Sequence, residues 1–382
     1  MTHISRVEVA NVRCHRHLGV EFSPGVNVLV GGNGVGKTSI LESVALVMTG
    51  RSPRASSLKG MIRQGEGSMR IDVWLSLTEK VCAGEYPAEE RLGGGSGRPL
   101  SETWVAAGYG VGGERRFFFN GGQVEDGRRL QETAHVRAFL PDDLRLVKGG
   151  PAPRRELLDA LAEVESPEHR LRLDRYRRAL EQRNALLRQG RLGDEHCPWE
   201  AVLADEGRSI METRVAVLAG FAPFFAEVVS ELGPSSSGPV KLLYRTNAEG
   251  LSEQEYRQRL ASLRAHDARR TFTHLGPHRD DLRFVSAALD VREHGSQGEQ
   301  RAVVLSLLLA EVRWLEQREA EAGLPVVLLL DDVLSELDDH RRRVLGEMLR
   351  GGVQSFLTTT DTQCLDQIHH DSVLTIEVSG GA

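Results

Sequence analysis

The sequence predicts an α/β protein in which a lobe built on a mixed sheet is interrupted by an inserted, mostly α-helical lobe. Three observations support this prediction. A short apolar strand runs through a glycine-rich loop into a helix at residues 26–49, and a second apolar strand at 325–332 ends in two aspartates. Between these segments, most of residues 151–270 show helical periodicity. With 382 residues, the chain is long enough for two lobes.

The glycine-rich loop has the spacing of a phosphate-binding loop. Val26–Val30 reads as a buried strand, and residues 31–38, GGNGVGKT, match G-x-x-x-x-G-K-[ST] at each fixed position. Glycines allow successive N–H groups to turn toward an anion, and the following helix adds the positive end of its dipole. We expect Lys37 to reach the β- and γ-phosphates of ATP and Thr38 to bind Mg²⁺. The residues assigned to the nucleotide are Gly31, Asn33, Gly34, Gly36, Lys37, Thr38 and Ser39.

The apolar strand Pro325–Asp332 predicts the second half of this site. A strand that is apolar throughout is buried on both faces, as in a parallel sheet, and α/β sheets bind ligands at the C-terminal ends of such strands. We expect Asp331 to hold Mg²⁺, directly or through water. Asp332 is expected to polarise the attacking water, so that it is catalytic together with Lys37. Asp142, which follows a short buried strand, is a further candidate metal ligand.

The first third of the chain reads mainly as strands, and the last part returns to an α/β pattern. Alternating residues predict strands at Ile4–Ala10, Val20–Phe22, Met69–Leu77, Thr103–Val111 and Arg116–Asn120, with glycine turns at 93–97 and 120–122. After the two aspartates we expect a helix at Asp339–Leu349 and strands at Gln354–Thr358 and Leu374–Val378. Residues 1–143 and 302–382 are therefore predicted to form the ATP-binding lobe.

The middle third reads as an inserted helical lobe, residues 144–301. Helices are expected from Pro151 to about Arg191, from Trp199 to about Leu232, at Glu253–Arg270, and from Gln300 to about Ala322. The lobe ends in residues 295–301, GSQGEQR, a second glycine-bearing turn at a helix N-terminus that offers N–H groups to an anion.

Two histidines of this lobe, His274 and His278, lie four residues apart beside two aspartates. Gly276 and Pro277 between them prevent a regular helix face. A structural or interface role for this pair of histidines is therefore favoured over a zinc site formed by the two.

Charge and cysteine content limit the classes of protein. The net charge of −6 means that a nucleic acid would need a local basic patch or a surface assembled on dimerisation. The chain has 43 arginines and five lysines, which suits bidentate phosphate contact, although a GC-rich genome explains the same bias. The candidate DNA contacts are Arg51, Arg54, Lys59, Arg177, Arg178 and Arg183.

We expect a cytoplasmic protein with no membrane partner. The four cysteines are far apart and form no C-x-x-C pair, which indicates a reducing compartment. No apolar run approaches the ~20 residues that cross a bilayer, and the N-terminal segment lacks the apolar core of a secretory signal.

The motifs, taken in order, resemble those of the ABC-type ATPases and more closely those of the RecF family of bacterial DNA replication and repair proteins. The resemblance runs nearly end to end. It is densest at residues 31–43, 139–151 with 154–155, 276–281, 296–301 and 329–338. The chain departs from the family at Val12–His15, and it has Ser39 for the usual asparagine and Glu299 for the usual glutamine. Thr360–Asp361 replaces the switch histidine of ABC transporters.

The resemblance implies a recombination mediator that binds ATP with Mg²⁺ and dimerises around the nucleotide. Such proteins recognise duplex DNA beside single-stranded gaps, and with RecR and RecO they help RecA to replace single-strand-binding protein. It also implies a signature segment that closes on the γ-phosphate of a second copy, and a D-loop. These residues are Ser296, Gln297, Gly298 and Glu299 for the signature, and Ser335 and Asp338 for the D-loop. We expect DNA-dependent ATP hydrolysis. It should be weak, because Asp332 is one methylene shorter than the glutamate usual in transporters.

Three other functions fit parts of the pattern. A transporter ATPase subunit would need a membrane partner, and the missing switch histidine and the arginine-rich insertion argue against it. A chromosome-tethering ATPase needs hundreds of heptad residues between its halves, whereas this insertion has about 150 residues without sustained heptads. A nucleotide-switched scaffold without significant turnover stays open.

Overall fold

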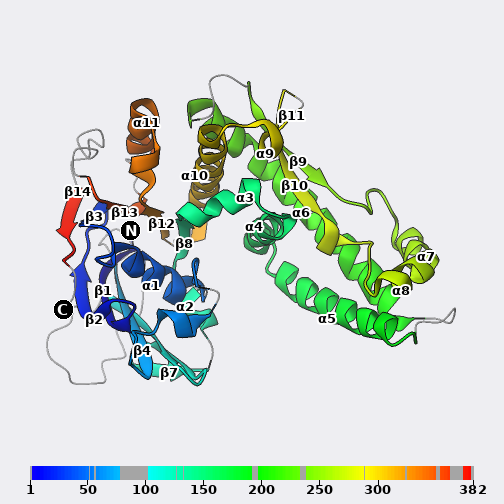
Figure 1. Cartoon of the computed structure of the whole chain (residues 1–382), viewed down its shortest axis with the longest axis horizontal. Helices are drawn as coiled ribbons and strands as arrows, with labels where there is room; N and C mark the ends of the chain where they lie inside the picture. The colour runs from blue at the N-terminus through cyan, green and yellow to red at the C-terminus, as the bar shows by residue number, and fades with distance from the viewer. Residues whose placement is uncertain are drawn as a thin grey trace. The chain divides into compact units, whose positions relative to one another are not determined.

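The computed structural model of the chain is shown in Figure 1. It describes residues 2–50, 52–55, 57–77, 102–125, 127–131, 133–191, 197–232, 238–287, 289–322, 325–349, 353–361 and 373–379. The chain divides into two compact units, Met1–Asp143 with Val312–Ala382 and Leu144–Glu311. The second division therefore falls inside a long helix, ten residues beyond the boundary expected at 301/302. The expected glycine turn at 93–97 lies outside the described residues.

The first unit contains a parallel sheet that carries the predicted nucleotide motifs. Its order is β14-β3-β13-β12-β8, and every neighbouring pair is parallel. The strands are β14 (Val373–Glu377), β3 (Val26–Val30), β13 (Gln354–Thr359), β12 (Val326–Asp331) and β8 (His135–Phe139). All six residues of the central strand β12 are buried, which explains why its sequence is apolar rather than alternating.

The antiparallel strands of this unit form a separate sheet of order β2-β1-β4-β5-β6-β7. They are β1 (Thr2–Val12), β2 (His15–Glu21), β4 (Ser68–Leu77), β5 (Glu102–Gly110), β6 (Arg115–Phe119) and β7 (Gly122–Val124). The predicted partner of the first strand, β2, pairs with it antiparallel. Buried Gln354 of β13 joins the two sheets, because its amide exchanges hydrogen bonds of 2.7 Å with both backbone groups of Ile4.

Helix α1 (Lys37–Thr49) contacts strands of both sheets. Eleven of its 13 residues are buried, so the helix is enclosed on all sides, as expected for a helix with no polar face. Ile40, Val44 and Val47 belong to the same hydrophobic core as residues of both sheets. The remaining elements of this unit are η1 (Leu58–Met61), α2 (Arg128–Gln131), η3 (Pro141–Leu144), η5 (Val333–Glu336) and α11 (Asp339–Leu349).

The second unit is mostly helical. Its helices are α3 (Arg145–Lys148), α4 (Pro151–Glu165), α5 (Glu168–Arg188), α6 (Pro198–Leu232), α7 (Glu253–Ser262), α8 (Arg264–Arg270), η4 (Pro277–Arg279), α9 (Val291–His294) and the start of α10 (Gln297–Ala322). It also contains a small antiparallel sheet of order β11-β10-β9, which the sequence analysis missed. The strands are β9 (Val240–Arg245), β10 (Asp281–Ser286) and β11 (Leu289–Asp290).

Two of the expected helices are each divided in the structure. Residues 151–191 were predicted as one helix, but α4 ends before Ser166, whose extended backbone (φ −141°, ψ 103°) is what Pro167 imposes on its predecessor. Residues 253–270 form α7 and α8, which meet at Leu263.

Helix α6 is, among the described residues, the one helix long and apolar enough to cross a membrane by length and composition. In this unit it packs against α4, α5, α7 and β9. Phe221, Phe225 and Val228 are buried there, and so is Arg214, which makes a bidentate ion pair of 2.8 and 3.0 Å with Asp159 of α4. The residue pattern of α6 is therefore that of a core helix.

The segment Gly276–Asp281 completes a buried polar network in the second unit. Arg214 also donates to the Pro277 carbonyl (2.9 Å) and to Asp280 (3.1 Å). His278 accepts a hydrogen bond from the Tyr176 hydroxyl at Nδ1 (2.7 Å) and donates from Nε2 to the Thr273 carbonyl (2.9 Å). Burial lowers the pKa of His278 to about 4. These contacts give this segment a structural role in joining α4, α5 and α6.

Candidate nucleotide-binding site

Several positions of the loop between β3 and α1 favour glycine, either because φ is positive or because a Cβ atom would clash. Gly34 and Gly36 have φ values of 82° and 99°, in the region that favours glycine. A Cβ on Gly36 would lie 2.1 Å from Nε2 of His15, and one on Gly31 would lie 2.5 Å from the Val378 carbonyl oxygen. The Gly36 carbonyl accepts a hydrogen bond of 3.2 Å from His15 of β2. The glycines therefore allow both the turn and the close packing against β2.

Lys37 is buried, and its ammonium group lies over the loop from which it projects. Its Nζ donates to the carbonyl oxygens of Gly31 (2.6 Å) and Gly32 (2.9 Å). The side chain therefore points back along the loop, toward the N-terminus of α1. Asn33 and Gly34 are exposed at the turn, and Ser39 is buried in the first turn of the helix.

Thr38 and Asp331, which are 293 positions apart in the chain, lie in direct contact. The Thr38 hydroxyl donates to the carboxylate of Asp331 at 2.7 and 3.0 Å. Thr358, which stands opposite Asp331 in the β12–β13 register, donates a third hydrogen bond to it at 2.7 Å. Carboxylate and hydroxyl oxygens are the ligands that Mg²⁺ prefers, so this group fits the ion. The parallel sheet thus brings together the two residues predicted to bind the metal.

Asp332 has an unusual backbone conformation. It lies in the left-handed region (φ 51°, ψ 27°), and its N–H donates to the Thr358 hydroxyl at 2.9 Å. Its Oδ1 is buried and has no hydrogen-bond partner among the described residues. A buried carboxylate oxygen without a partner is costly, so a water or another polar group is expected to bind there. This observation is consistent with the role predicted for Asp332.

Two other predicted groups follow the same edge of the sheet. Ser335 donates to the Asp332 carbonyl (2.9 Å), and Asp338 accepts from the backbone of Arg341 (2.9 Å), which caps α11. The backbone of Asp142 lies in η3, after β8, and its side chain is outside the described part of the chain. Thr359 and Asp361 hydrogen-bond to each other where β13 ends.

The sequence analysis missed the contribution of the turn between β1 and β2. In this turn, Nε and Nη2 of Arg13 donate to the two carboxylate oxygens of Glu42 of α1 at 3.0–3.2 Å. Glu42 is fully buried. Ser52 also donates to Glu42. These contacts and His15 hold the start of α1 in place. No local pattern in the sequence indicates these contacts, because Glu42 lies 29 positions after Arg13.

The predicted signature segment begins α10 in the second unit. Ser296 and Glu299 form a capping box: the Ser296 N–H donates to the Glu299 carboxylate (2.7 Å), and the Glu299 N–H donates to the Ser296 hydroxyl (3.3 Å). Gln300 donates to the carbonyls of Val291, Arg292 and Gly295, which fixes the preceding turn. A Cβ on Gly298 would meet no atom within 4 Å, so this side of the helix start is open.

The candidate DNA contacts differ in exposure. Arg54 and Lys59 of the first unit are exposed, as are Arg177 and Arg178 of the second unit. Arg51 lies outside the described residues. The assignment of Arg183 was wrong, because this side chain is fully buried and donates to Asp267, Glu200, Thr273 and the Leu260 carbonyl. It is a core residue of the helical unit and cannot reach a phosphate in solution.

Curated relatives with one shared name match almost the whole chain. The protein of Heliobacterium modesticaldum named DNA replication and repair protein RecF is 37% identical over 369 residues, which cover 94% of this chain and 92% of that protein. The protein of the same name from Symbiobacterium thermophilum is 34% identical over 372 residues, covering 95% and 92%.

Solved structures give the same result. A structure described as the recombination mediator protein RecF-ATP in the RecFOR pathway covers all of this chain and 96% of that one, with a TM-score of 0.81 and 26% identity. The Smc head domain of Pyrococcus furiosus shares the fold, with a TM-score of 0.56 and 15% identity.

The fold and the site define a P-loop protein of the ABC-ATPase type. The model for the RecF/RecN/SMC N terminal domain matches residues 3–380. The chain belongs to this family and, within it, to the RecF proteins. The fold class and the family expected from the sequence are therefore confirmed.

Proposed function

We propose that this chain binds Mg·ATP at the loop 31–38, dimerises around the nucleotide, and acts as a recombination mediator at gapped DNA. The observation that carries the proposal is the Thr38–Asp331 contact beside a glycine loop whose lysine is buried. Binding of a nucleotide with Mg²⁺ is the role that best explains why a threonine hydroxyl, an apolar strand that ends in aspartate and a glycine with positive φ lie together. The similar structure described as RecF-ATP supports ATP as the nucleotide.

In this proposal the chain's own residues orient the phosphates. The loop N–H groups and the N-terminus of α1 bind the β-phosphate, and Lys37 exchanges its bonds to Gly31 and Gly32 for phosphate oxygens. Thr38 and Asp331 would hold Mg²⁺, which neutralises phosphate charge. Asp332 orients the attacking water through its buried Oδ1 and accepts its proton.

One phosphate loop contacts the nucleotide from one side. The signature segment 296–299 of a second copy would close the other side, since the open face at Gly298 allows a phosphate to approach the start of α10. ATP would then stabilise the dimer, because it makes contacts that exist in the dimer alone. Loss of the γ-phosphate releases them.

DNA binding and the partners RecR, RecO and RecA are the remaining parts of the proposal. Arg54, Lys59, Arg177 and Arg178 are exposed cations that suit phosphate contact. If they neutralise phosphates, the logarithm of the DNA affinity falls with the logarithm of salt by about 0.9 per contact. A salt-independent affinity would refute this part alone.

The experiment is light scattering of the purified chain with Mg·ATP and with Mg·ADP, repeated with gapped duplex DNA. We expect a dimer with ATP and a monomer with ADP. Lys37→Met should stay monomeric with both nucleotides. Arg6→Met is a matched control, because it removes a cation of the same unit whose side chain is 46% exposed and pairs with Glu8 of the same strand, outside the loop. A wild-type monomer at micromolar concentration under saturating Mg·ATP would overturn the proposal.

A nucleotide-switched scaffold is the second candidate. It is favoured by the side chain of Asp332, which is one methylene shorter than a glutamate and therefore reaches less far toward an attacking water. Single-turnover hydrolysis with and without gapped DNA separates the two functions: bound ATP that is not hydrolysed within the lifetime of the dimer identifies the scaffold.

A further inference from the structure

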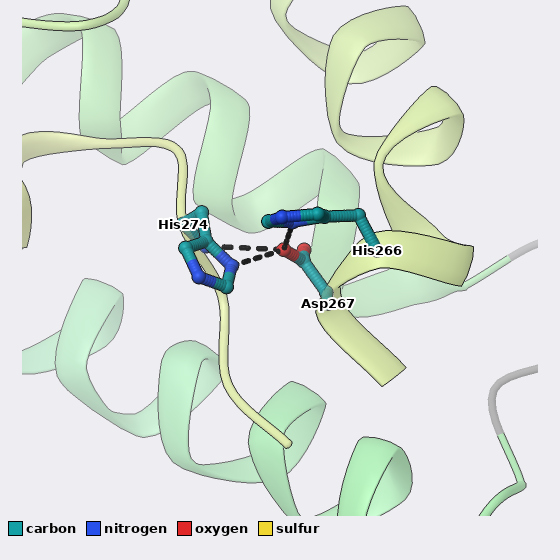
Figure 2. A group of neighbouring side chains, drawn as sticks. All are labelled: His266, Asp267 and His274. Carbon is teal, nitrogen blue, oxygen red and sulfur yellow. Dashed lines mark hydrogen bonds and ion pairs between the residues drawn. The ribbon is translucent and has the colours of Figure 1, made fainter. Parts of the chain in front are cut away.

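Two histidine side chains of the second unit converge on one carboxylate oxygen of Asp267. His266 and Asp267 come from α8, and His274 comes from the segment that follows it (Figure 2). Nδ1 of His274 lies 2.8 Å from Oδ1 of Asp267, and Nδ1 of His266 lies 3.8 Å from the same atom. One candidate ligand atom from each residue lies within 4.8 Å of the other two.

The carboxylate at the centre of this cluster is held rigidly. Asp267 is fully buried, and its Oδ2 accepts a hydrogen bond of 2.7 Å from Arg183, which is itself buried. Arg183 is fixed in turn by Glu200, Thr273 and the Leu260 carbonyl. A hydrogen-bond donor on one oxygen of a metal-binding carboxylate fixes the orientation of the group and leaves the other oxygen to bind the ion. Oδ1 of Asp267 is that oxygen, and besides the imidazole of His274 it accepts the backbone N–H of the same residue at 3.3 Å.

The spacing is close to that of a tetrahedral metal site. Zinc–nitrogen and zinc–oxygen bonds of about 2.0–2.1 Å place neighbouring ligand atoms about 3.3–3.4 Å apart. The two distances to Asp267, 2.8 and 3.8 Å, lie on either side of this value. Changes of about half an ångström, within the range of a rotamer adjustment, would make them equal.

The histidines are accessible while the aspartate is buried. The side chains of His266 and His274 are 45% and 23% exposed, and the Asp267 side chain is 0% exposed. An ion can therefore reach the imidazoles from solvent and bind a water as its fourth ligand. The His274 ring packs on Phe272 at 4.2 Å between centroids, which limits its rotation.

We propose that His266, Asp267 and His274 form a binding site for a divalent transition-metal ion of the zinc class. The ion replaces the hydrogen bond from His274 Nδ1 to Asp267: Nδ1 gives up its proton to solvent, Nε2 takes a proton from solvent, and the ring stays neutral. Two imidazoles and one carboxylate are ligands that zinc accepts. The positive charge of Arg183 on Oδ2 opposes the ion, so we expect micromolar affinity, weaker than that of a cysteine site.

The consequence for the protein is a cross-link between α8 and the segment leading to η4. This segment carries Thr273, which bonds Arg183, and it precedes Pro277 and His278 of the buried network. A bound ion would stabilise the helical unit without contact with ATP. The proposal is thus independent of the proposed function and is tested without nucleotide.

The test is titration of the full chain, stripped with chelator, by Zn²⁺ and by Co²⁺. We expect one ion per chain, the strong visible absorption of tetrahedral Co²⁺, and a raised midpoint of thermal unfolding. His266→Ala and His274→Ala should each weaken the affinity at least tenfold. His294→Ala is the matched control, because His294 is also an exposed histidine beside a carboxylate, that of Glu293, and it should bind like wild type.

His266 is exposed, so its variant is expected to fold, and circular dichroism would verify this. Binding that His266→Ala and His274→Ala leave unchanged would overturn the proposal. So would weak, octahedral Co²⁺ absorption, or the absence of Zn²⁺ binding at about 100 μM, far above the dissociation constant expected for such a site.

Discussion

Glycines of the phosphate loop are needed for two separate reasons: they adopt backbone conformations that other residues rarely adopt, and they allow neighbouring residues to pack closely. Gly36 shows both, since its φ of 99° is strained for other residues and its Cα lies against His15 and Cys14. Lys37 and Thr38 act through side chains: the motif predicts phosphate contact for Lys37 and Mg²⁺ binding for Thr38, whereas the bonds of Lys37 to the Gly31 and Gly32 carbonyls were not expected. The contact of Gly36 with His15 was not expected, because no rule of spacing connects a histidine in one strand to a glycine 21 positions later.

Gly36→Ala should therefore damage both the fold and nucleotide binding. A left-handed conformation costs an alanine ~1–2 kcal/mol, and the methyl group would also displace the His15 ring. We expect a lower free energy of unfolding in urea and loss of ATP binding measured by calorimetry. Gly32→Ala is the control for the fold, since its Cβ would meet Val35 alone, at an ordinary 3.9 Å. Equal stability of the two variants would contradict this reading of Gly36.

Arg183 shows why residue roles in the helical unit could not be assigned from sequence. In the chain it is one of seven arginines of α5. Its partners Glu200 and Asp267 lie 17 and 84 positions away, so no local pattern distinguishes it from exposed Arg177. Burial of an arginine depends on which carboxylates the tertiary fold brings to it.

At the scale of elements, the strands that carry the nucleotide motifs were predictable from the sequence, and the strands of the second unit were not. β3 is apolar except for Asn27, and β12 is apolar up to Asp331, as expected for short strands buried on both faces. β9 (VKLLYR) and β10 (DLRFVS) alternate between more and less buried residues, but they are short and lie among long helical patterns. The break between α4 and α5 was readable from Pro167, which disfavours helix at the preceding residue.

The polar network around η4 predicts that the second unit loses stability in mild acid. Burial lowers the pKa of His278 to about 4, whereas an unfolded histidine titrates near 6.5. The unfolded chain therefore binds more protons between these values, so this contribution is full above about pH 6.5 and is lost as the pH falls toward 4. The predicted loss is on the order of 3 kcal/mol.

Urea unfolding of wild type and His278→Asn at pH 7 and pH 5 measures this effect. His278→Asn should be less stable at pH 7, because Tyr176 loses its acceptor, and should depend less on pH in this window. His294→Asn, an exposed histidine of the same unit, should retain the wild-type pH dependence. An unchanged pH dependence in His278→Asn would exclude His278 as its source.

At the scale of the whole molecule, the chain is two units joined through α10. This helix begins with the signature residues and continues into the nucleotide-binding unit, where residues 312 onward belong. Its length and its start at a glycine turn were readable from sequence, except that the helix begins three residues earlier, at Gln297. One continuous helix therefore begins with the segment proposed as the signature and ends in the unit that carries the phosphate loop.

Asp332→Asn tests whether hydrolysis controls the dimer. The amide cannot accept the proton of the attacking water, and loss of a general base slows such steps by roughly 10²–10⁴. Binding should persist, because Thr38, Asp331 and Lys37 are unchanged. We expect the ATP-bound dimer of Asp332→Asn to last longer than that of wild type in size-exclusion light scattering after excess nucleotide is removed. If the dimer lifetime is the same in Asp332→Asn and wild type, Asp332 does not act on the water.

Ser296→Arg should prevent the dimer, because its long cation replaces the capping hydroxyl that holds Glu299. A dimer in Ser296→Arg would show that the copies meet through another surface.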